Sequence, residues 1–274
     1  MESGTPSPSL VRSATSSYDY VYNHVKDKIP VRPLFIIKYG PPASGKNTCI
    51  NLLREHLTGL DQGSTVDADL DVIISQIPGF QNDSVQMSKQ DAYQKWRSLG
   101  MEMMDDLIRQ ATLIPCHITF ETTGSSIDWT VPLIKQMISL GYRIVIMYPL
   151  VQVDKLIQRA KIRQQQTGQV AAPTHSVQVN NRTILGITEM NQLATQNLRI
   201  LIPYVDELFL IDNNSDQDVA RIILHIRNVS GGTKSEQKHI PGTIKSVKCS
   251  GATKTEWYDK YIKQLLIKNC SARS

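Results

Sequence analysis

The segment Phe35-Ile-Ile-Lys-Tyr-Gly40-Pro-Pro-Ala-Ser-Gly45-Lys46-Asn47-Thr48 carries three signals of local structure in direct succession. The run from Leu34 to Tyr39 is rich in β-branched and aromatic residues, which predicts a buried strand. A loop bounded by Gly40 and Gly45 follows. Beyond it, apolar side chains recur at helical spacing, at Cys49, Leu52, Leu53, His56 and Leu57. A strand, a glycine-bounded loop and a helix start are the context in which G-x-x-x-x-G-K predicts a phosphate-binding (Walker A) loop.

The chemistry of such a loop follows from its backbone. Glycines allow a tight turn in which successive N–H groups point at an anion, and the helix N-terminus adds partial positive charge. Lys46 would reach the β- and γ-phosphates. We therefore expect ATP or GTP to be bound by Gly40, Pro41, Pro42, Ala43, Ser44, Gly45, Lys46, Asn47 and Thr48. The plain alternative is a glycine-containing turn with an incidental lysine.

One position departs from the usual motif. The residue after the lysine is ordinarily Ser or Thr, whose hydroxyl binds Mg²⁺, but here it is Asn47, with Thr48 one place later. An amide oxygen ligates a hard cation more weakly than a charged group does, and Thr48 is rotated by about 100° on the helix. We expect Mg²⁺ to be held by Asn47 or Thr48, with turnover depending on this substitution.

Strand and helix patterns alternate along the rest of the chain. Strands are expected at 115–120, 142–148 and 207–211, and helices at 88–110, 128–140, 153–166, 177–196 and 216–229. Ser88 is the expected cap of the first of these helices, Ser126 or Asp128 that of the second, and Gly141 ends the second. The segment around Pro78 and Gly79 is expected to be irregular. The alternation predicts an α/β fold, a parallel sheet with helices on both faces.

Composition divides the chain into three parts. Residues 1–30 begin rich in Ser, Thr and Pro, which predicts a disordered or packing arm. Residues 31–230 form the expected P-loop domain, and residues 231–274 a basic tail with a terminal helix as one outcome. From 234 onward the tail has nine Lys and Arg against three acidic residues, or +6, so residues 1–233 carry −1 of the net +5. We expect either docking of the tail on the domain or binding of a nucleic acid or acidic partner.

Cysteine spacing and hydropathy indicate the compartment. The four cysteines, Cys49, Cys116, Cys249 and Cys270, show no C-x-x-C pair and no metal-type spacing, so we expect free thiols in a reducing compartment. No apolar run approaches the length of a membrane span, and no apolar N-terminal segment suggests a signal peptide. The expected location is cytoplasmic, with no membrane partner.

Phosphoryl transfer needs a base near the acceptor hydroxyl, and acidic residues follow the predicted strands. Asp67 or Asp69, in the cluster after the second strand, is the candidate base. Glu121 is a candidate for holding the acceptor or orienting a metal-bound water, and Thr123 for donating to substrate. The alternative is that the aspartates and Glu121 only cap the helices that follow them.

A pair of arginines is placed to stabilise the transferred phosphate. Arg159 and Arg163 are four residues apart and share one helix face with Lys155. They lead into a polar loop at Thr167, which predicts a mobile lid over the nucleotide. The alternative is a solvated charged face.

The order of these motifs resembles the zeta-toxin family of P-loop kinases from about Leu34 to Asp212. Asp69, in Asp67-Ala-Asp69, matches the catalytic base of that family. Phe120-Glu121-Thr122-Thr123 is similar to its E-G-T element with Thr122 in place of glycine, Gly141-Tyr142 matches its G-Y step, and Arg159 falls at its phosphate-contacting arginine.

Two features depart from the family. Asn47 replaces the hydroxyl that binds Mg²⁺, and Val170 or Ala171 stands where a second arginine precedes the lid proline, which leaves Arg163 or Arg182 to compensate. The resemblance implies ATP- or GTP-dependent phosphorylation of a hydroxyl on a small molecule or nucleotide-sugar, which in the toxins is a UDP-activated amino sugar. The alternative, from another class, is a nucleotide-binding or structural protein without turnover, which would bind ATP without help from Mg²⁺.

Overall fold

The computed structural model describes residues 32–57, 60, 65–114, 116–167, 172–179, 182–215, 220–228 and 244–248. The chain forms two compact units. The first comprises Met1–Phe35 and Thr58–Glu121, and the second Ile36–Leu57 and Thr122–Ser274. The expected N-terminal arm and nearly all of the basic tail lie outside the described residues.

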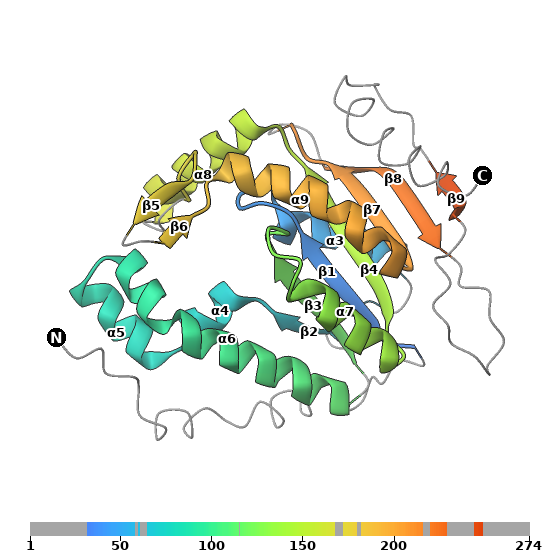
Figure 1. The fold of residues 1–274 in the computed structure, drawn as a ribbon, viewed down its shortest axis with the longest axis horizontal. Coiled ribbons are helices and arrows are strands. Elements are labelled where there is room, and N and C mark those ends of the chain that lie inside the picture. The colour runs from blue at the N-terminus through green and yellow to red at the C-terminus, as the bar shows by residue number, and fades with distance from the viewer. Residues whose placement is uncertain are drawn as a thin grey trace. The chain divides into compact units, whose positions relative to one another are not determined.

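The first unit joins two parallel strands to three helices. Strand β2 (Thr65–Ala68) pairs in parallel with β3 (His117–Thr122), in a register that places Asp67 opposite Thr119. The helices are α4 (Leu70–Ser75), α5 (Pro78–Gln86) and α6 (Lys89–Leu113), drawn together in Figure 1. Ile74, Ile77 and Trp96 form their shared core. Ser88 caps α6 as predicted, because its Oγ accepts a hydrogen bond from the Asp91 N–H at 3.1 Å.

Helix α5 corrects the expectation of an irregular segment at Pro78 and Gly79. Pro78 stands at the first helical position, where its fixed φ suits the turn and its missing N–H is not needed. Gly79 allows close packing, since a Cβ there would lie 2.1 Å from the Trp96 ring. The Trp96 indole N–H donates to Asp83 at 2.6 Å. Tertiary packing on α6 thus makes a helix of residues that read locally as a turn.

The second unit holds most of the strands. They are the greater part of β1 (Leu34–Tyr39), β4 (Arg143–Leu150), β7 (Glu207–Asp212), β8 (Arg221–Asn228) and β9 (Ile244–Lys248). Within this unit the hydrogen-bonded strand order is β1-β4-β7-β8-β9. The β4–β7 pair is parallel, whereas β7–β8 and β8–β9 are antiparallel. The predicted α/β class is confirmed, with a mostly parallel sheet and an antiparallel edge (Figure 1).

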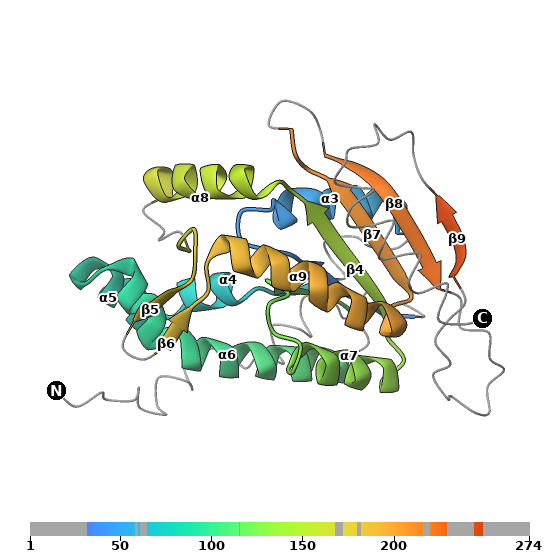
Figure 2. The same cartoon turned by 45° about the horizontal axis from the view of Figure 1, so that its top comes forward.

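Helices cover the strands of the second unit. They are α3 (Lys46–His56), α7 (Thr130–Ser139), α8 (Val153–Thr167), α9 (Ile187–Leu201) and the 3₁₀ turn η2 (Ile202–Tyr204). Figures 1 and 2 both draw α9 along the strands, with α3 behind them in Figure 1. The Tyr39 hydroxyl, at the end of β1, donates to the Ala194 carbonyl of α9 at 2.7 Å. Tyr148 of β4 is buried under these helices, and this burial raises the pKa of its hydroxyl to about 12.

Two predicted helices are corrected to strands. Residues 221–228 form β8 rather than part of a helix from 216, and Leu224 and Ile226 are buried at every second position. Glu207 of β7, only 1% exposed, pairs with His225 of β8 at 2.5 Å and with Arg143 of β4. This buried carboxylate therefore favours the strand, which brings His225 beside it.

The expected helix 177–196 is also two structures. Its first half is the antiparallel hairpin β5 (Val177–Val179) and β6 (Arg182–Ile184), and only its second half lies in α9. Glu189 in the first turn of α9 accepts a hydrogen bond from the Ser176 N–H at 3.1 Å, so the chain before the hairpin is fastened to the helix start.

Smaller corrections concern helix faces and caps. In α3, Ile50 is buried and His56 is exposed, so His56 does not belong to the apolar face. Helix α7 is preceded by Trp129 without a side-chain cap, and neither Ser126 nor Asp128 has that role. Gly141 ends the α7 segment as predicted, with φ +84° and its N–H donating to Ile138 at 3.0 Å.

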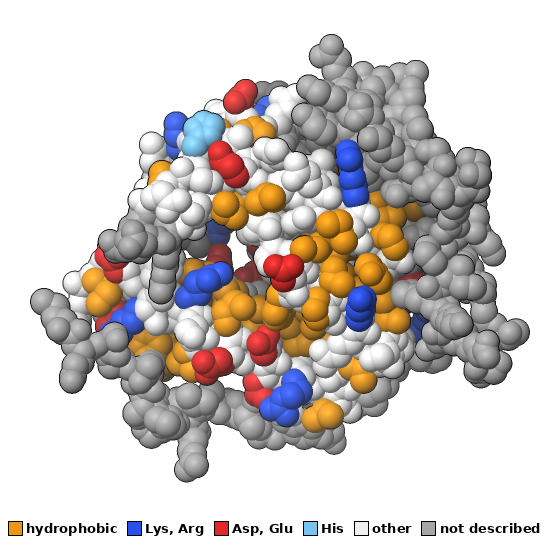
Figure 3. All heavy atoms as spheres, in the orientation of Figure 1, with side chains coloured by type: hydrophobic (Ala, Val, Ile, Leu, Met, Phe, Trp, Pro, Cys, Tyr) orange, Lys and Arg blue, Asp and Glu red, His pale blue; other side chains and the backbone are white. Residues whose placement is uncertain are grey.

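The described surface mixes charge and apolar area. On the face drawn in Figure 3, acidic and basic side chains alternate with hydrophobic ones and form no continuous band of one sign among the described residues. Within that same part of the chain, no helix is long and apolar enough to cross a membrane.

Candidate functional site

The loop between β1 and α3 has the backbone shape of an anion cradle. Its residues Gly40, Ala43 and Gly45 have positive φ values of 131°, 64° and 81°. Gly45 supplies no side-chain cap to α3, and the N–H groups of Thr48 and Cys49 turn back to its carbonyl at 3.1 and 3.0 Å. A helix N-terminus without a side-chain cap presents N–H donors and a positive dipole end to an anion.

The side chain of Lys46 lies within the loop. Its Nζ donates to the carbonyls of Gly40 at 2.9 Å and Pro41 at 3.1 Å, and the residue is only 6% exposed. The alternative of an incidental surface lysine does not agree with this burial.

Asn213, directly after β7, braces the loop from outside. Its Nδ2 donates to the Ser44 carbonyl at 2.8 Å. A Cβ on Gly45 would lie 2.3 Å from that Nδ2, so any larger residue at 45 would push the Asn213 amide out of this hydrogen bond. On the other side, a Cβ on Gly40 would lie 3.1 Å from the Tyr148 ring. The loop is therefore fitted to its neighbours at both of its glycines.

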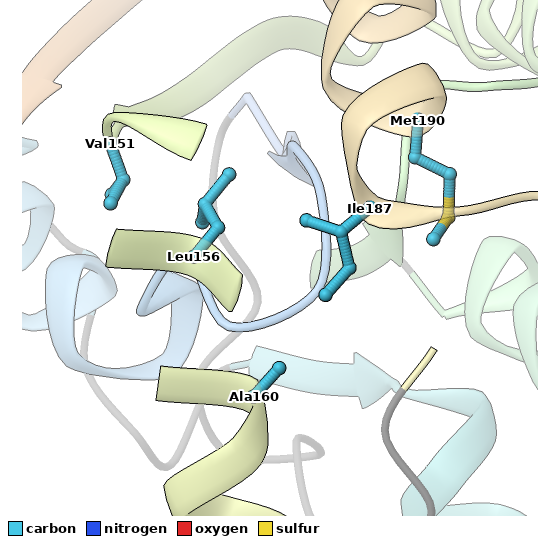
Figure 4. Close-up of a cluster of buried hydrophobic side chains, with 5 residues drawn as sticks. All are labelled: Val151, Leu156, Ala160, Ile187 and Met190. Atoms are coloured by element: carbon cyan, nitrogen blue, oxygen red, sulfur yellow. The ribbon is translucent and has the colours of Figure 1, made fainter. Parts of the chain in front are cut away.

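An apolar cluster supports the middle of the loop. Figure 4 shows this cluster, in which side chains from α8 and from the residue after β4 lie near those from the start of α9; they are Val151, Leu156, Ala160, Ile187 and Met190. Ala43 packs against this cluster from the loop. Because a non-glycine residue at φ +64° carries strain, this packing helps to hold Ala43 in place.

Arg159 and Lys155 bind the chain next to Asn213. The Arg159 guanidinium donates to the carbonyls of Asn213 at 2.9 Å and Ser215 at 3.3 Å, and Lys155 Nζ donates to the Asn214 carbonyl. Arg159 is thus not a merely solvated residue. Arg163, one turn further along α8, is exposed. The predicted stripe places Arg159 and Lys155 beside the segment that braces the loop.

Sequence reasoning did not single out Asn213. A usable signal existed, because the polar run from Asp212 to Ser215 directly follows a buried strand. Asp69 and Glu121 are candidates for the same reason, because each lies at the end of a predicted strand.

A second buried lysine bears on the metal expectation. Lys38 in β1 is 2% exposed, and its Nζ donates to Asn47 Oδ1 at 3.1 Å. A Mg²⁺ ion bound by that oxygen at the usual 2.0–2.1 Å would lie no more than about 5 Å from the ammonium. Repulsion at that separation is roughly 7 kcal/mol at an effective dielectric constant of about 20.

Asn47 therefore does not fit a Mg²⁺ ligand in this arrangement. Thr48 is exposed on the next position of the helix. Among the described residues, no group of three or more His, Cys, Asp or Glu side chains could hold a metal ion.

In the first unit, Asp69 has the capping role that was the alternative interpretation. Its Oδ1 accepts hydrogen bonds from the N–H groups of Asp71 at 3.0 Å and Val72 at 3.4 Å, at the start of α4. It is nevertheless buried, at 6% exposure. Asp67 lies inside β2 rather than after it and accepts a hydrogen bond from the Thr119 hydroxyl. Glu121 is half-buried near the end of β3.

Thr123 takes part in a tight turn of the second unit. Its Oγ1 lies 2.7 Å from Ser125 Oγ and accepts the Ser125 N–H at 3.4 Å. The turn is anchored at Gly124, whose carbonyl accepts from the Tyr39 hydroxyl at 3.3 Å and from Asn197 Nδ2 at 2.9 Å. This turn begins in Thr122, whose carbonyl accepts the Gly40 N–H at 3.1 Å. The turn is therefore joined to the first residue of the loop.

Two of the four cysteines lie among the described residues, Cys49 in α3 of the second unit and Cys116 just before β3 in the first. Cys49 and Cys116 are free and buried, as the sequence predicted, whereas Cys249 and Cys270 lie outside the described residues. Burial raises the pKa of Cys49 to about 11, against the opposing charge of Arg159.

Comparison with known proteins adds a family to this geometry. Residues 22–216 match the family model described as Zeta toxin. No curated protein sequence matches the chain.

Solved structures are similar in fold. One, from work on the PezAT chromosomal toxin-antitoxin system of Streptococcus pneumoniae, has 15% sequence identity and a TM-score of 0.56 over 77% of this chain and 80% of that chain. A native AvrRxo1-ORF1:ORF2 complex has 12% identity and a TM-score of 0.59 over 95% and 74%. The same complex with ATP has 12% identity and a TM-score of 0.56 over 92% and 70%.

Proposed function

The chain belongs to the zeta toxin family, and we propose that it is a nucleotide-dependent kinase. It transfers the γ-phosphoryl group of ATP or GTP to a hydroxyl of a small molecule or nucleotide-sugar. The observation that carries this proposal is the buried Lys46 ammonium, held across a loop with three positive φ values. A similar structure that is described with ATP supports nucleotide binding.

The phosphate chain is assigned to the loop. Backbone N–H groups of the loop that are not bonded within the fold, with the N-terminus of α3, are proposed to surround the phosphates, and Lys46 adds a charge-assisted hydrogen bond. The N–H groups of Gly40, Ser44 and Thr48 are already bonded to carbonyls, and Pro41 and Pro42 have none. Arg159 lies with Asn213 beside the same loop, which supports a role in stabilising charge on the transferred group. Arg163 is proposed for the same purpose from the next turn of α8.

The acceptor is assigned to polar residues in the last part of β2 and β3 and directly after these strands. We propose Asp69 as the base, because it matches the family base in motif order and its capping bonds both fall on Oδ1, which fixes the carboxylate. Asp67, Glu121 and Thr123 are proposed to bind the acceptor. As the acceptor oxygen bonds to the γ-phosphorus, the bond from that phosphorus to the β–γ bridging oxygen breaks, and the hydroxyl proton passes to the base. Asn47 does not fit a Mg²⁺ ligand, so the cationic groups of this step are those of the chain itself.

One alternative function keeps the loop and lacks the transfer step. The Lys38–Asn47 hydrogen bond at the usual metal position favours a nucleotide-binding protein without turnover. The first proposal predicts a phosphorylated product and the alternative predicts none.

A transfer assay separates the two functions. Labelled ATP is incubated with a panel of nucleotide-sugars, nucleosides and polynucleotide ends, and products are identified by mass spectrometry. Lys46→Ala and Asp69→Asn are each expected to lower transfer by about a hundredfold or more. Glu102→Gln, an exposed acid on α6, is the matched control and should keep the wild-type rate. Equal rates for wild type, Lys46→Ala and Asp69→Asn would remove the kinase assignment.

Partners beyond the acceptor are a separate proposal. The PezAT structure is described as part of a toxin-antitoxin system, which supports testing for a protein partner here. A nucleic acid or acidic partner at the basic tail stays a prediction, as does the cytoplasmic location.

A further inference from the structure

Lys38 is a buried cation that the proposed transfer mechanism does not use. It lies in β1, two residues before Gly40, with 2% of its surface exposed. Lysine is rarely buried to this extent without partners. One of its partners is the side-chain oxygen of Asn47, at 3.1 Å. A strand residue before the loop thus places positive charge at the second residue of α3.

Asn47 occupies the position where a phosphate loop carries its Mg²⁺-binding hydroxyl. In such loops the metal binds that oxygen and neutralises charge on the phosphates. Here the corresponding oxygen is bound by an ammonium, at about 3 Å rather than the 2.0–2.1 Å of a Mg²⁺ bond. The position of positive charge is similar, but the charge comes from the chain itself.

We propose that the Lys38 ammonium replaces Mg²⁺ at this loop, so that the protein binds metal-free ATP rather than the magnesium complex. This inference rests on the proposed nucleotide site. It identifies the form of nucleotide that the site takes. Lys46 and Lys38 then provide two ammonium groups at the two ends of the loop, one through Gly40 and Pro41 and one through Asn47.

The choice of asparagine at position 47 agrees with this role. An ammonium has only donors, so the amide oxygen faces Lys38 and the NH₂ group stays available as a donor. A phosphate oxygen can accept from that NH₂ group. A serine or threonine hydroxyl at this position has only one hydrogen to donate. Asn47 thus connects the buried cation to the place of the phosphates.

Charge repulsion between Lys38 and a bound Mg²⁺ is what would make the site select free ATP over the magnesium complex. A Mg²⁺ ion at the Asn47 oxygen would be within about 5 Å of the ammonium, which is less than the screening length of about 8 Å at physiological ionic strength. The magnesium complex is therefore expected to bind no better than free ATP, although Mg²⁺ usually strengthens binding at phosphate loops.

The test is isothermal titration of ATP into the full chain, in EDTA and in excess Mg²⁺. The wild type is expected to bind in EDTA with an affinity within about threefold of that in Mg²⁺, or more tightly. Lys38→Met should lose about tenfold or more of its affinity in EDTA. The double variant Lys38→Met/Asn47→Thr should bind about tenfold more tightly with Mg²⁺ than without it, since it restores the usual ligand and removes the competing charge. Lys161→Met, an exposed lysine of α8, is the control and should behave as wild type.

A second readout follows the metal directly. Mn²⁺ can replace Mg²⁺, and its electron paramagnetic resonance signal broadens when it is held with ATP on the protein. The double variant should show this bound signal and the wild type should not. Thermal melting checks that the variants stay folded, and the wild-type comparison of EDTA with Mg²⁺ needs no variant.

The outcomes separate this inference from the proposed function. Wild-type binding that is tenfold or more tighter with Mg²⁺ would overturn the replacement by Lys38 and leave the kinase assignment standing. No ATP binding in either buffer would overturn both. Metal-independent binding without phosphoryl transfer in either buffer would support the replacement and overturn the kinase assignment.

Discussion

Replacing Gly45 with alanine tests how the loop is held. Gly45 has φ +81°, a conformation that costs a residue with a Cβ about 1–2 kcal/mol. The new Cβ would also lie 2.3 Å from Asn213 Nδ2. The amide is the flexible end of its side chain and can swing away, but it then loses its 2.8 Å hydrogen bond to Ser44, about 1 kcal/mol. The expected loss in free energy of unfolding is about 2–3 kcal/mol.

Gly141 provides the matched control. It has φ +84°, and nothing lies within 4 Å of a Cβ added there. Gly141→Ala should therefore cost only the backbone strain, about 1–2 kcal/mol. Urea unfolding at equilibrium measures both variants. Asn213→Ala should cost about 1 kcal/mol in the wild type and much less in the Gly45→Ala background, because the hydrogen bond is already lost there.

Nucleotide binding separates the two glycines further. Gly45→Ala should weaken ATP binding, since it moves the brace of the loop, whereas Gly141→Ala should bind ATP as the wild type does. If the two variants lose equal stability, and Gly45→Ala still binds ATP normally, the reasoning about Asn213 and the loop is refuted.

Three further predictions concern packing and thiol chemistry. Gly79→Ala should destabilise the protein by about 1–3 kcal/mol in urea unfolding, because its Cβ would meet the rigid Trp96 ring at 2.1 Å; an unchanged midpoint would contradict the packing of α5 on α6. Tyr39→Phe should cost about 1 kcal/mol by the same measurement, since it removes the hydrogen bond to Ala194; no loss would show that this bond contributes nothing net. Alkylation of Cys49 at pH 8 should be far slower in the native protein than in urea, and should rise only as pH approaches the raised pKa of about 11. Peptide mapping measures it, and equal rates in the two states would contradict the burial.

The fold was predictable where local pattern and tertiary environment agree. Leu34–Tyr39 is apolar except for Lys38 and is fully buried in β1, and Ser88 caps α6 as its position indicated. The prediction of a helix over 221–228 was wrong because three consecutive apolar residues, Ile222 to Leu224, hide the alternation of a strand. That alternation buries Leu224 and Ile226. Pairing with β7 decides that segment, and no local signal encodes the pairing.

The phosphate-loop motif of the site was predictable, but the residues that contact and hold the loop were not. The glycine-bounded loop and Lys46 follow from spacing alone. The contact of Asn213 with Ser44 joins residues 169 positions apart, which no spacing rule covers. Lys38 lies in an otherwise apolar strand, so the sequence does not mark it as a site residue. Its hydrogen bond to Asn47 depends on how the loop places α3 relative to β1. Such contacts depend on three-dimensional packing, so the sequence marked position 47 as unusual without giving the reason.

The central claim is that the loop and Lys46 bind the phosphates of a nucleotide. The most direct measurement is equilibrium binding of ATP, ADP, AMP and adenosine to the wild type and to Lys46→Met. The account predicts that wild-type affinity falls as phosphates are removed, and that Lys46→Met binds ATP more weakly and shows a smaller difference between ATP and adenosine. Equal affinity of the wild type for ATP and adenosine, or unchanged ATP binding by Lys46→Met, would contradict it.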